Sequence, residues 1–531
     1  MTSWWRLKKQ LQESNAAHTR RAVAREELFL SVLPRAAAGS QICEFAAGIG
    51  SVPLLERVRA QAPPFEWSNE TSVAAAGGGH LGVLKWLRNQ DPPCSWNAEA
   101  CEAAVSSGHL DVLRWMRSQP LPCPWDAMSS RLATVAAFEG HLDALQYLHQ
   151  EGCAWDESTT AAAAAGDHLH VLQWCRAATP PCPWDTGVAY AAVESGSLQV
   201  VQWLLPELLR QGVGCLIPGS LLSRAANAGH LAMLQWMAAN APAGQPLWTA
   251  SDDAVDACTK AAAHGHLDVL RCLRGELKCP WNEEACSAAA QNGHLNVLQW
   301  LHAGGCPWDD NTSWHAADRG DLEMFKWACS RGCPCTTTTS QLIAEQGNFE
   351  MLRWAHENGC PWDATTCTTL AANGHLDMLK WAHTNGCPFA KKHETCSAAA
   401  LNGELEILQW LHEQDCPWDA STTAAALKPA NLKIYSWLKN NGCPAAAATA
   451  AAAARHGLID ILMELHVLQG KKNSGVKRKC ISLLAMNAAA AGGQLATVQW
   501  LRSLTPPCPW SVMTCVNAAR SGNYELLRWM R

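Results

Sequence analysis

One short motif returns along almost the whole chain and constrains its fold more than any other feature. The sequence Gly-His-Leu begins at Gly374, and a leucine and a tryptophan usually follow it three and five residues after the Leu. Further clear copies begin at Gly79, Gly108, Gly140, Gly229, Gly265 and Gly293. When copies in which some motif residues are replaced are included, there are about 17, mostly 27 or 29 residues apart. A chain of 531 residues with such a period is a repeat array rather than a row of globular domains.

Each repeat is expected to form two short helices joined by a tight turn. In the repeat from Trp362 to Pro388, Asp363 is suited to cap the first helix, and the apolar positions after it fall on one helical face. Gly374 fits the left-handed residue that ends such a helix. The second helix, around Leu376–Ala382, is apolar over a wide arc. One repeat cannot bury these faces alone, so the pattern predicts an all-α helical repeat solenoid.

The aromatic residues follow the same period. The chain has 27 Trp but only 4 Tyr and 7 Phe, and all Trp except Trp4, Trp5 and Trp314 fall in two frames, one in the second helix and one in the turn between repeats. We therefore assign packing roles to both Trp frames and to the Gly-His step between the helices. The residues to which we assign a structural role are Trp300, Trp354, Trp381, Trp362, His294, His375, Gly293 and Gly374.

The repeat, written W-D-x-x-T-C-x-x-A-A-x-x-G-H-L-x-V-L-x-W-L-x-x-x-G-C-P, resembles the ankyrin repeat over about residues 41–531. It shares the A-A-x-x-G-H step, the V-L-x-W-L second helix and the closing G-C-P turn. It is about six residues shorter than the usual period of 33, and the T-P-L-H opening is absent. The resemblance therefore implies an ankyrin-like solenoid of about 17 helix–turn–helix repeats with shortened β-hairpin fingers. The variant is similar to the short, Trp-rich ankyrin repeats of protists, algae and giant viruses.

Two parts of the chain are distinguished by composition. Residues 1–40 are expected to form an N-terminal amphipathic helical segment, and residues 41–531 the solenoid. The period is interrupted at 206–220, 240–252 and 470–480. The last interruption contains a basic loop at 471–479, which is a solvated insertion, a nuclear-import signal or an anion-binding patch. The chain stops inside a second helix, which leaves open whether it is part of a longer protein.

The 25 cysteines form a ladder with about one member per repeat. Stacked helices lie about 8–10 Å apart, so we expect these thiols neither to converge on a metal ion nor to reach one another for disulfides. Cys333 and Cys335 are close in sequence but lack the C-x-x-C spacing. We predict free, mostly structural thiols in a reducing compartment, with a metal site or a reactive exposed thiol as the alternatives.

Motifs of catalysis are missing from the sequence. A G-x-G-x-x-G match at Gly77–Gly82 has no strand before it, so we do not interpret it as a dinucleotide site. The net charge is −6, and no segment is long and apolar enough for a membrane span. We expect no enzyme activity, no cofactor, no metal, no membrane and no nucleic-acid partner. We also expect a monomer in the cytoplasm, with the nucleus as an alternative.

The sequence predicts a protein–protein interaction scaffold or adaptor that binds a partner along its concave face. Recognition is expected at exposed first-helix positions that do not repeat. The candidate partner-binding residues are Glu102, Tyr190, Trp314, His315, Gln341 and Arg319. Trp314 is the favoured anchor, because exposed Trp often dominates binding energy. The alternatives are nucleic-acid or nuclear-import-linked binding through 471–479, or a repeat region whose active domain lies elsewhere in a longer protein.

Overall fold

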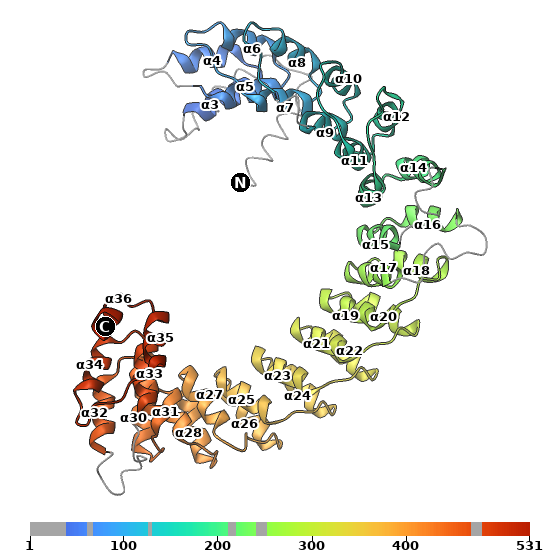
Figure 1. Ribbon diagram of the computed structural model, residues 1–531. Helices are drawn as coiled ribbons and strands as arrows, with labels where there is room; N and C mark the ends of the chain where they lie inside the picture. Colours follow the sequence, from blue (N-terminus) through green and yellow to red (C-terminus); the bar gives the residue numbers. More distant parts are fainter. Residues whose placement is uncertain (1–38, 61–66, 126–129, 211–218, 241–251, 469–480) are drawn as a thin grey trace. The chain divides into compact units, whose positions relative to one another are not determined.

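The computed structural model describes residues 39–60, 67–125, 130–210, 219–240, 252–468 and 481–531. Within these ranges the chain is a series of short helices without a β-strand, and consecutive helices pair as helix–turn–helix repeats (Figure 1). The predicted all-α repeat solenoid is therefore confirmed. The chain divides into two compact units, the first comprising residues 1–261 and 268–280 and the second residues 262–267 and 281–531.

Unit 1 contains eight helix pairs in the described residues. Their first helices are α3 (Gly39–Gly48), α5 (Asn69–Gly77), α7 (Ala98–Ser106), α9 (Arg131–Phe138), α11 (Glu157–Ala165), α13 (Thr186–Ser195), α15 (Gly219–Ala228) and α17 (Asp252–Ala263). Their second helices are α4 (Val52–Arg59), α6 (Leu81–Arg88), α8 (Leu110–Arg117), α10 (Leu142–Gln150), α12 (Leu169–Ala177), α14 (Leu198–Arg210), α16 (Leu231–Ala239) and α18 (Leu267–Gly275).

Unit 2 continues the same alternation. Its first helices are α19 (Glu283–Asn292), α21 (Asp310–Asp318), α23 (Thr337–Gln346), α25 (Ala364–Ala372), α27 (Glu394–Asn402), α29 (Ala420–Ala425), α31 (Ala447–Arg455), α33 (Leu483–Ala491) and α35 (Val512–Arg520). Its second helices are α20 (Leu295–Ala303), α22 (Leu322–Ser330), α24 (Phe349–Glu357), α26 (Leu376–Thr384), α28 (Leu405–Glu413), α30 (Leu432–Asn440), α32 (Ile459–Leu468), α34 (Leu495–Ser503) and α36 (Tyr524–Met530). A short 3₁₀ helix, η1 (Pro429–Asn431), precedes α30.

The helix boundaries follow from local chemistry. At α25, the carboxylate of Asp363 accepts a hydrogen bond of 2.8 Å from the backbone N–H of Thr365 and so caps the first turn. Gly374 then adopts a left-handed conformation with φ of +82°, which costs glycine little, and the chain turns into α26. Similar glycines stand between the two helices of most repeats, so the Gly-His-Leu motif is the turn of the repeat.

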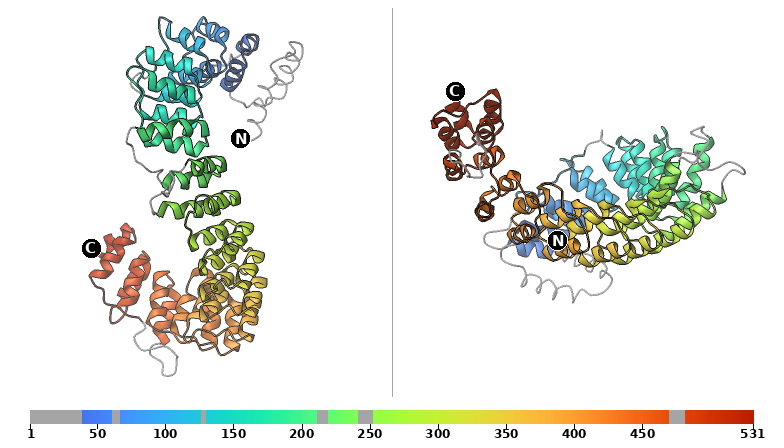
Figure 2. Two further views of the ribbon diagram at one scale, coloured as in Figure 1. Left: turned by 90° about the vertical axis from the view of Figure 1, so that its right-hand side faces the viewer. Right: turned by 90° about the horizontal axis from the view of Figure 1, so that it is seen from below.

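The two kinds of helix pack differently along each unit. First helices of neighbouring repeats pack directly on one another, whereas second helices of neighbouring repeats make few contacts. The buried positions of first helices are mostly Ala, Cys, Ser and Thr, and those of second helices are mostly Leu, Val and Met. Because small residues allow closer approach, each unit taken by itself curves with its first helices on the inner side (Figures 1 and 2).

The predicted domain boundaries and interruptions can be compared with the structure only in part. Residues 1–38 lie outside the described residues, so the expected N-terminal amphipathic helices lie there too, and α3 begins at Gly39. Helix α14 continues through Pro206 to Arg210, so regular structure extends into the first predicted interruption. The remaining interruptions, including the basic loop 471–479, lie largely or wholly outside the described residues. None of the described helices combines the length and apolar character that crossing a bilayer requires.

Candidate partner-binding face

The inner face of each unit is formed by the first-helix positions that packing leaves uncovered. In α25, Thr366, Cys367, Leu370 and Ala371 are fully buried between neighbouring helices. Thr368 and Thr369, which lie between the two buried pairs, are only half-buried. The positions that correspond to Thr368 in other repeats hold residues as different as Glu102, Tyr190, Trp314 and Gln341. This face is therefore the place where the array presents chemistry that differs along its length.

Trp314 and His315 stand together on the inner face of α21 in unit 2. Both are half-buried, and their rings meet edge to face with centroids 5.1 Å apart. Burial lowers the pKa of His315 below its usual value, although the carboxylates of Asp318 and Asp309 act in the opposite direction. The imidazole is therefore neutral at neutral pH, and the two side chains form one aromatic spot.

Exposed acidic side chains lie on the helix that carries this aromatic spot and on the two neighbouring first helices. Exposed Glu284 lies on α19, exposed Asp318 on α21 and exposed Glu345 on α23, where half-buried Gln341 also lies. The three helices carry no Lys or Arg within their bounds. We refer to one set of six residues as the acidic–aromatic patch. It consists of Glu284, Trp314, His315, Asp318, Gln341 and Glu345.

Two of the predicted binding residues lie in unit 1, where they connect neighbouring repeats. Glu102 on α7 forms an ion pair of 2.8 Å with Arg131 on α9. The hydroxyl of Tyr190 on α13 is 3.2 Å from that of Ser220 on α15, and the guanidinium of Arg224 lies 4.6 Å from the centre of the Tyr190 ring. These side chains are thus already engaged on the inner face, and the structure does not bring them together with Trp314.

Arg319 also contacts a neighbouring repeat. Its guanidinium donates a hydrogen bond of 3.2 Å to the carbonyl of Gln291 at the end of α19 and covers Gly293. It thereby occupies the place that the motif histidine fills in other repeats. A partner would have to displace this contact in order to use Arg319.

The motif histidines connect consecutive repeats. The Nε2–H of His294 donates a hydrogen bond of 3.1 Å to the carbonyl of Ala263, and its ring lies over Gly265, where even a methyl group would clash. His375 covers Gly347 in the same way. Where Asp321 or Asn348 replaces the histidine, the side chain instead caps its own second helix. The position therefore connects neighbouring helix ends where it holds His294 or His375, and it caps its own helix where it holds Asp321 or Asn348.

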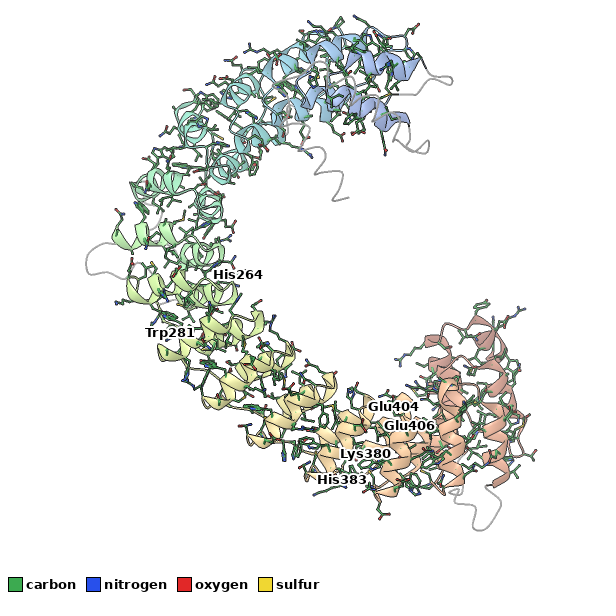
Figure 3. All side chains as sticks on the ribbon, turned by 180° about the vertical axis from the view of Figure 1, so that it is seen from behind. His264, Trp281, Lys380, His383, Glu404 and Glu406 are labelled. Carbon is green, nitrogen blue, oxygen red and sulfur yellow. The ribbon has the colours of Figure 1, made fainter. Side chains whose placement is uncertain are left out.

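Figure 3 shows on which side of unit 2 the residues between paired helices and the residues of the turns between repeats lie. Glu404, which replaces the motif histidine in its repeat, and His264 lie on the inner side, where first helices end. Trp281 and His383 lie on the outer side, beside the turns between repeats. The carboxylate of Glu404 approaches Gly374 as a histidine ring does elsewhere.

The turn tryptophans form a second ladder on the side of the second helices. Trp362 meets Trp381 of its own repeat edge to face, with centroids 5.7 Å apart, and His356 of the preceding repeat stacks on it at 3.9 Å. Trp300 contacts Trp281 at 5.8 Å, and Trp354 contacts Phe325 at 5.7 Å. These rings fill the space between repeats and leave the inner face to other side chains.

The cysteines require one correction. None of the described cysteines forms a disulfide and most are buried, but some thiols hydrogen-bond to one another, as those of Cys175 and Cys182 do, and the sulfur atoms of Cys329 and Cys335 lie 2.9 Å apart. The prediction that no two thiols can reach each other is therefore wrong for this pair. Helix spacing does not limit it, because Cys335 follows the turn that folds back on the end of α22. No group of three or more His, Cys, Asp or Glu in the described residues is arranged to hold a metal ion.

Two features, one on the inner face and one in a turn between repeats, were missed from the sequence, although both left a signal there. The acidic residues of the patch stand three or ten residues after the turn position of their repeat. A comparison of the charges on first helices with those on second helices would have singled out these carboxylates. Cys329 stands six residues before Cys335, which is the spacing between His356 and the turn residue Trp362. That shared spacing indicates side chains that meet across one turn.

No protein-family model matches this chain, and no curated protein matches its sequence. Among solved structures, the pentatricopeptide repeat protein PPR10 in complex with an 18-nucleotide psaJ RNA element is similar at 12% identity and a TM-score of 0.32, covering 98% of this chain and 88% of that one. PPR10 from maize gives 12% identity and a TM-score of 0.27, covering 99% and 87%. These low scores carry no argument about family or ligand beyond the helical repeat architecture described above.

One expectation nevertheless has to be corrected. We expected no nucleic-acid partner from the net charge and the repeat pattern, but helical repeat chains similar to this one are seen in complex with RNA. A solenoid of this kind does not exclude a nucleic acid, so that exclusion is wrong. The chain is a helical repeat scaffold, and the chemistry of its faces has to indicate what it binds.

Proposed function

We propose that this chain is a protein-binding scaffold without catalytic activity, built from a shortened type of ankyrin repeat. The ankyrin resemblance is supported by the left-handed glycine between the helices and by the antiparallel helix pair. The described residues between repeats form short turns around C-P-W instead of strands, as a lost hairpin finger would leave them. The described cysteines are free thiols, which supports a reducing compartment such as the cytoplasm.

The observation that carries this proposal is the acidic–aromatic patch. Its carboxylates at Glu284, Asp318 and Glu345 are exposed on three successive first helices that carry no Lys or Arg within their bounds, and the adjacent Arg319 is engaged with the carbonyl of Gln291. Complementary charge favours an approaching basic segment and speeds its association. The half-buried Trp314 offers an aromatic anchor on the middle helix of the three. The partner that fits is a segment of protein rich in Lys and Arg with an apolar side chain among them.

The experiment is a selection from a random peptide library against the full chain. We expect the selected peptides to be enriched in Lys and Arg together with an aromatic or aliphatic residue. Binding of a selected peptide should fall at least about tenfold with Trp314→Ala, because truncation of a central aromatic anchor often costs about 2 kcal/mol or more. It should also fall with the triple variant Glu284→Lys, Asp318→Lys and Glu345→Lys.

A matched control reverses the same number of charges on the second helices. The variant Glu323→Lys, Glu357→Lys and Asp377→Lys changes exposed residues of α22, α24 and α26 and should leave peptide affinity within about twofold. A mixed-sequence single-stranded RNA is tested in parallel. The proposal fails if no basic peptide is selected, or if both triple variants weaken binding equally. Tight RNA binding that the patch reversal strengthens would assign the face to nucleic acid instead.

A further inference from the structure

Cys329 and Cys335 occupy a place that other repeats give to a pair of rings. In three other repeats of unit 2, the last turn of the second helix carries a histidine that stacks on the turn tryptophan six residues later. These pairs are His302 with Trp308, His356 with Trp362 and His412 with Trp418, with centroids 4.0, 3.9 and 4.1 Å apart. Cys329 at the end of α22 and Cys335 after Pro334 have the same spacing and the same two positions. One repeat of unit 2 has therefore replaced its ring stack by two thiols.

The geometry of this pair differs from that of the other cysteines. The two sulfur atoms are 2.9 Å apart across a single turn. Both side chains are half-buried, whereas every other described cysteine is buried except Cys515, which is exposed and belongs to α35. Two small side chains fill less of a place built for two rings, and both cysteines are partly exposed. This pair thus combines proximity with access.

The surroundings of the two sulfur atoms make them chemically unequal. The thiols of Cys329 and Cys360, which hydrogen-bond to the Cys335 sulfur, lower the pKa of Cys335 well below its usual value, against the effect of burial. The same hydrogen bond, together with burial, raises the pKa of Cys329. Cys335 is therefore the better nucleophile at neutral pH, and Cys329 is a protonated thiol beside it.

We propose that Cys329 and Cys335 form a hydroperoxide-sensitive modification site that closes to a disulfide. The thiolate of Cys335 attacks hydrogen peroxide, so that an S–O bond forms, the O–O bond breaks and water leaves after taking up a proton. Cys329 then loses its proton and attacks the Cys335 sulfur, so that the S–S bond forms and the hydroxyl leaves as a second water. Two thiols are oxidised by two electrons in total, and one peroxide is reduced to two waters.

The disulfide would tie the end of α22 to the residue that leads into α23. Helix α23 carries Gln341 and Glu345 of the acidic–aromatic patch, so the closed form fixes the turn that precedes a helix of that patch. The redox site does not depend on the proposed protein binding, because its geometry stands whether or not a partner exists.

The test is peptide mapping of the intact chain after treatment with hydrogen peroxide. Trypsin cuts after Lys326, Arg331 and Arg353, which places Cys329 and Cys335 on separate peptides in the reduced protein. We expect the two peptides to become joined, with loss of two hydrogen atoms. Cys333 shares the second peptide, so the experiment is repeated with Cys333→Ala, and the joined species should remain. The buried pair Cys175 and Cys182 is the internal control and should stay reduced at the same dose.

Two variants test the order of the steps. With Cys329→Ser, oxidation of Cys335 should stop at a sulfenic acid that dimedone traps. With Cys335→Ser, dimedone should label nothing at Cys329. Alkylation of Cys335 by iodoacetamide should change less than about twofold between pH 8 and pH 6, whereas an ordinary thiol with a pKa near 8.5 slows by more than about tenfold.

Three results would overturn the proposal. One is joined peptides from Cys175 and Cys182 at the same rate as from Cys329 and Cys335. Another is dimedone labelling of Cys329 in place of Cys335. The third is a disulfide between Cys335 and Cys360 that forms in full yield in the wild type while no disulfide to Cys329 is detected. Thermal melts of the Ser variants within about 3 °C of wild type verify that the comparison uses folded chains.

Discussion

The turns between repeats are of two lengths, and each length has its own partner for the turn tryptophan. In long turns such as 88–96 and 176–184, an arginine eight residues before the Trp lies over its ring, with Arg88 4.3 Å from the centre of Trp96 and Arg176 4.2 Å from that of Trp184. In short turns such as 356–362, a histidine six residues before the Trp stacks on it. The two extra residues account for most of the difference between periods of 29 and 27.

The length of the turn, rather than its place in the chain, decides which partner is used. Most long turns lie in unit 1 and most short turns in unit 2, but each unit contains an exception. His149 stacks on Trp155 at 4.0 Å in a short turn of unit 1, and Arg502 lies 4.7 Å from Trp510 in a long turn of unit 2. An arginine spans the longer gap and also donates a hydrogen bond to the turn cysteine carbonyl, as Arg88 does to Cys94 at 2.9 Å. The aromatic ladder is therefore preserved while the backbone around it changes length.

The largest expected effect removes the ring that both kinds of turn share. Trp96→Ala in a long turn and Trp362→Ala in a short turn should each lower the free energy of unfolding by about 3 kcal/mol, because each leaves a cavity between repeats and frees its stacking partner. Urea denaturation followed by circular dichroism measures both. A loss in one turn type but not in the other would break the comparison, because it would mean that only one type depends on its tryptophan.

A smaller effect is expected from exchanging the partner without changing the turn. Arg88→His should destabilise by about 1–2 kcal/mol, because the shorter side chain loses both the ring of Trp96 and the carbonyl of Cys94. Replacing residues 88–96 by the seven-residue segment 356–362 should restore most of that loss. If Arg88→His is as stable as wild type, turn length does not select the partner.

The smallest effect concerns the backbone of the turn. Gly359 in a short turn has φ of +81° with no heavy atom near its missing Cβ, so Gly359→Ala should cost about 1 kcal/mol from backbone strain alone. Asn89, the residue that follows α6 at the start of a long turn, has φ of −86°, and Asn89→Ala should stay within about 0.5 kcal/mol. Thermal melts of the two variants, compared with wild type, measure this difference. Equal losses would show that both turns have the same conformational demand.

The sequence predicts the repeat architecture well because its determinants are local. The cap at Asp363, the left-handed Gly374 and the apolar spacing between them each act within one turn of chain. The hydrogen-bond acceptor of His294 could not be predicted in the same way, because it is the carbonyl of Ala263, which belongs to the preceding repeat. That contact depends on how one repeat sits on the next.

Residues of the candidate site could be predicted only where they depart from the residue pattern that the other repeats share. Trp314 could be singled out because it lies outside both tryptophan frames, and the structure places it on the inner face. Glu102 was selected by the same positional rule, yet it is already paired with Arg131 on the next helix. The position of a residue in the repeat predicts which face it occupies, while its freedom to bind depends on its neighbour in the next repeat.

The measurement that tests the central claim most directly is hydrogen exchange of the full chain with and without a selected basic peptide. The account predicts added protection in α19, α21 and α23, where the acidic–aromatic patch lies, and little change in α20, α22 and α24 of the same repeats. Protection confined to the second helices or to the turns between repeats would contradict the claim that the inner face of the first helices is the binding surface.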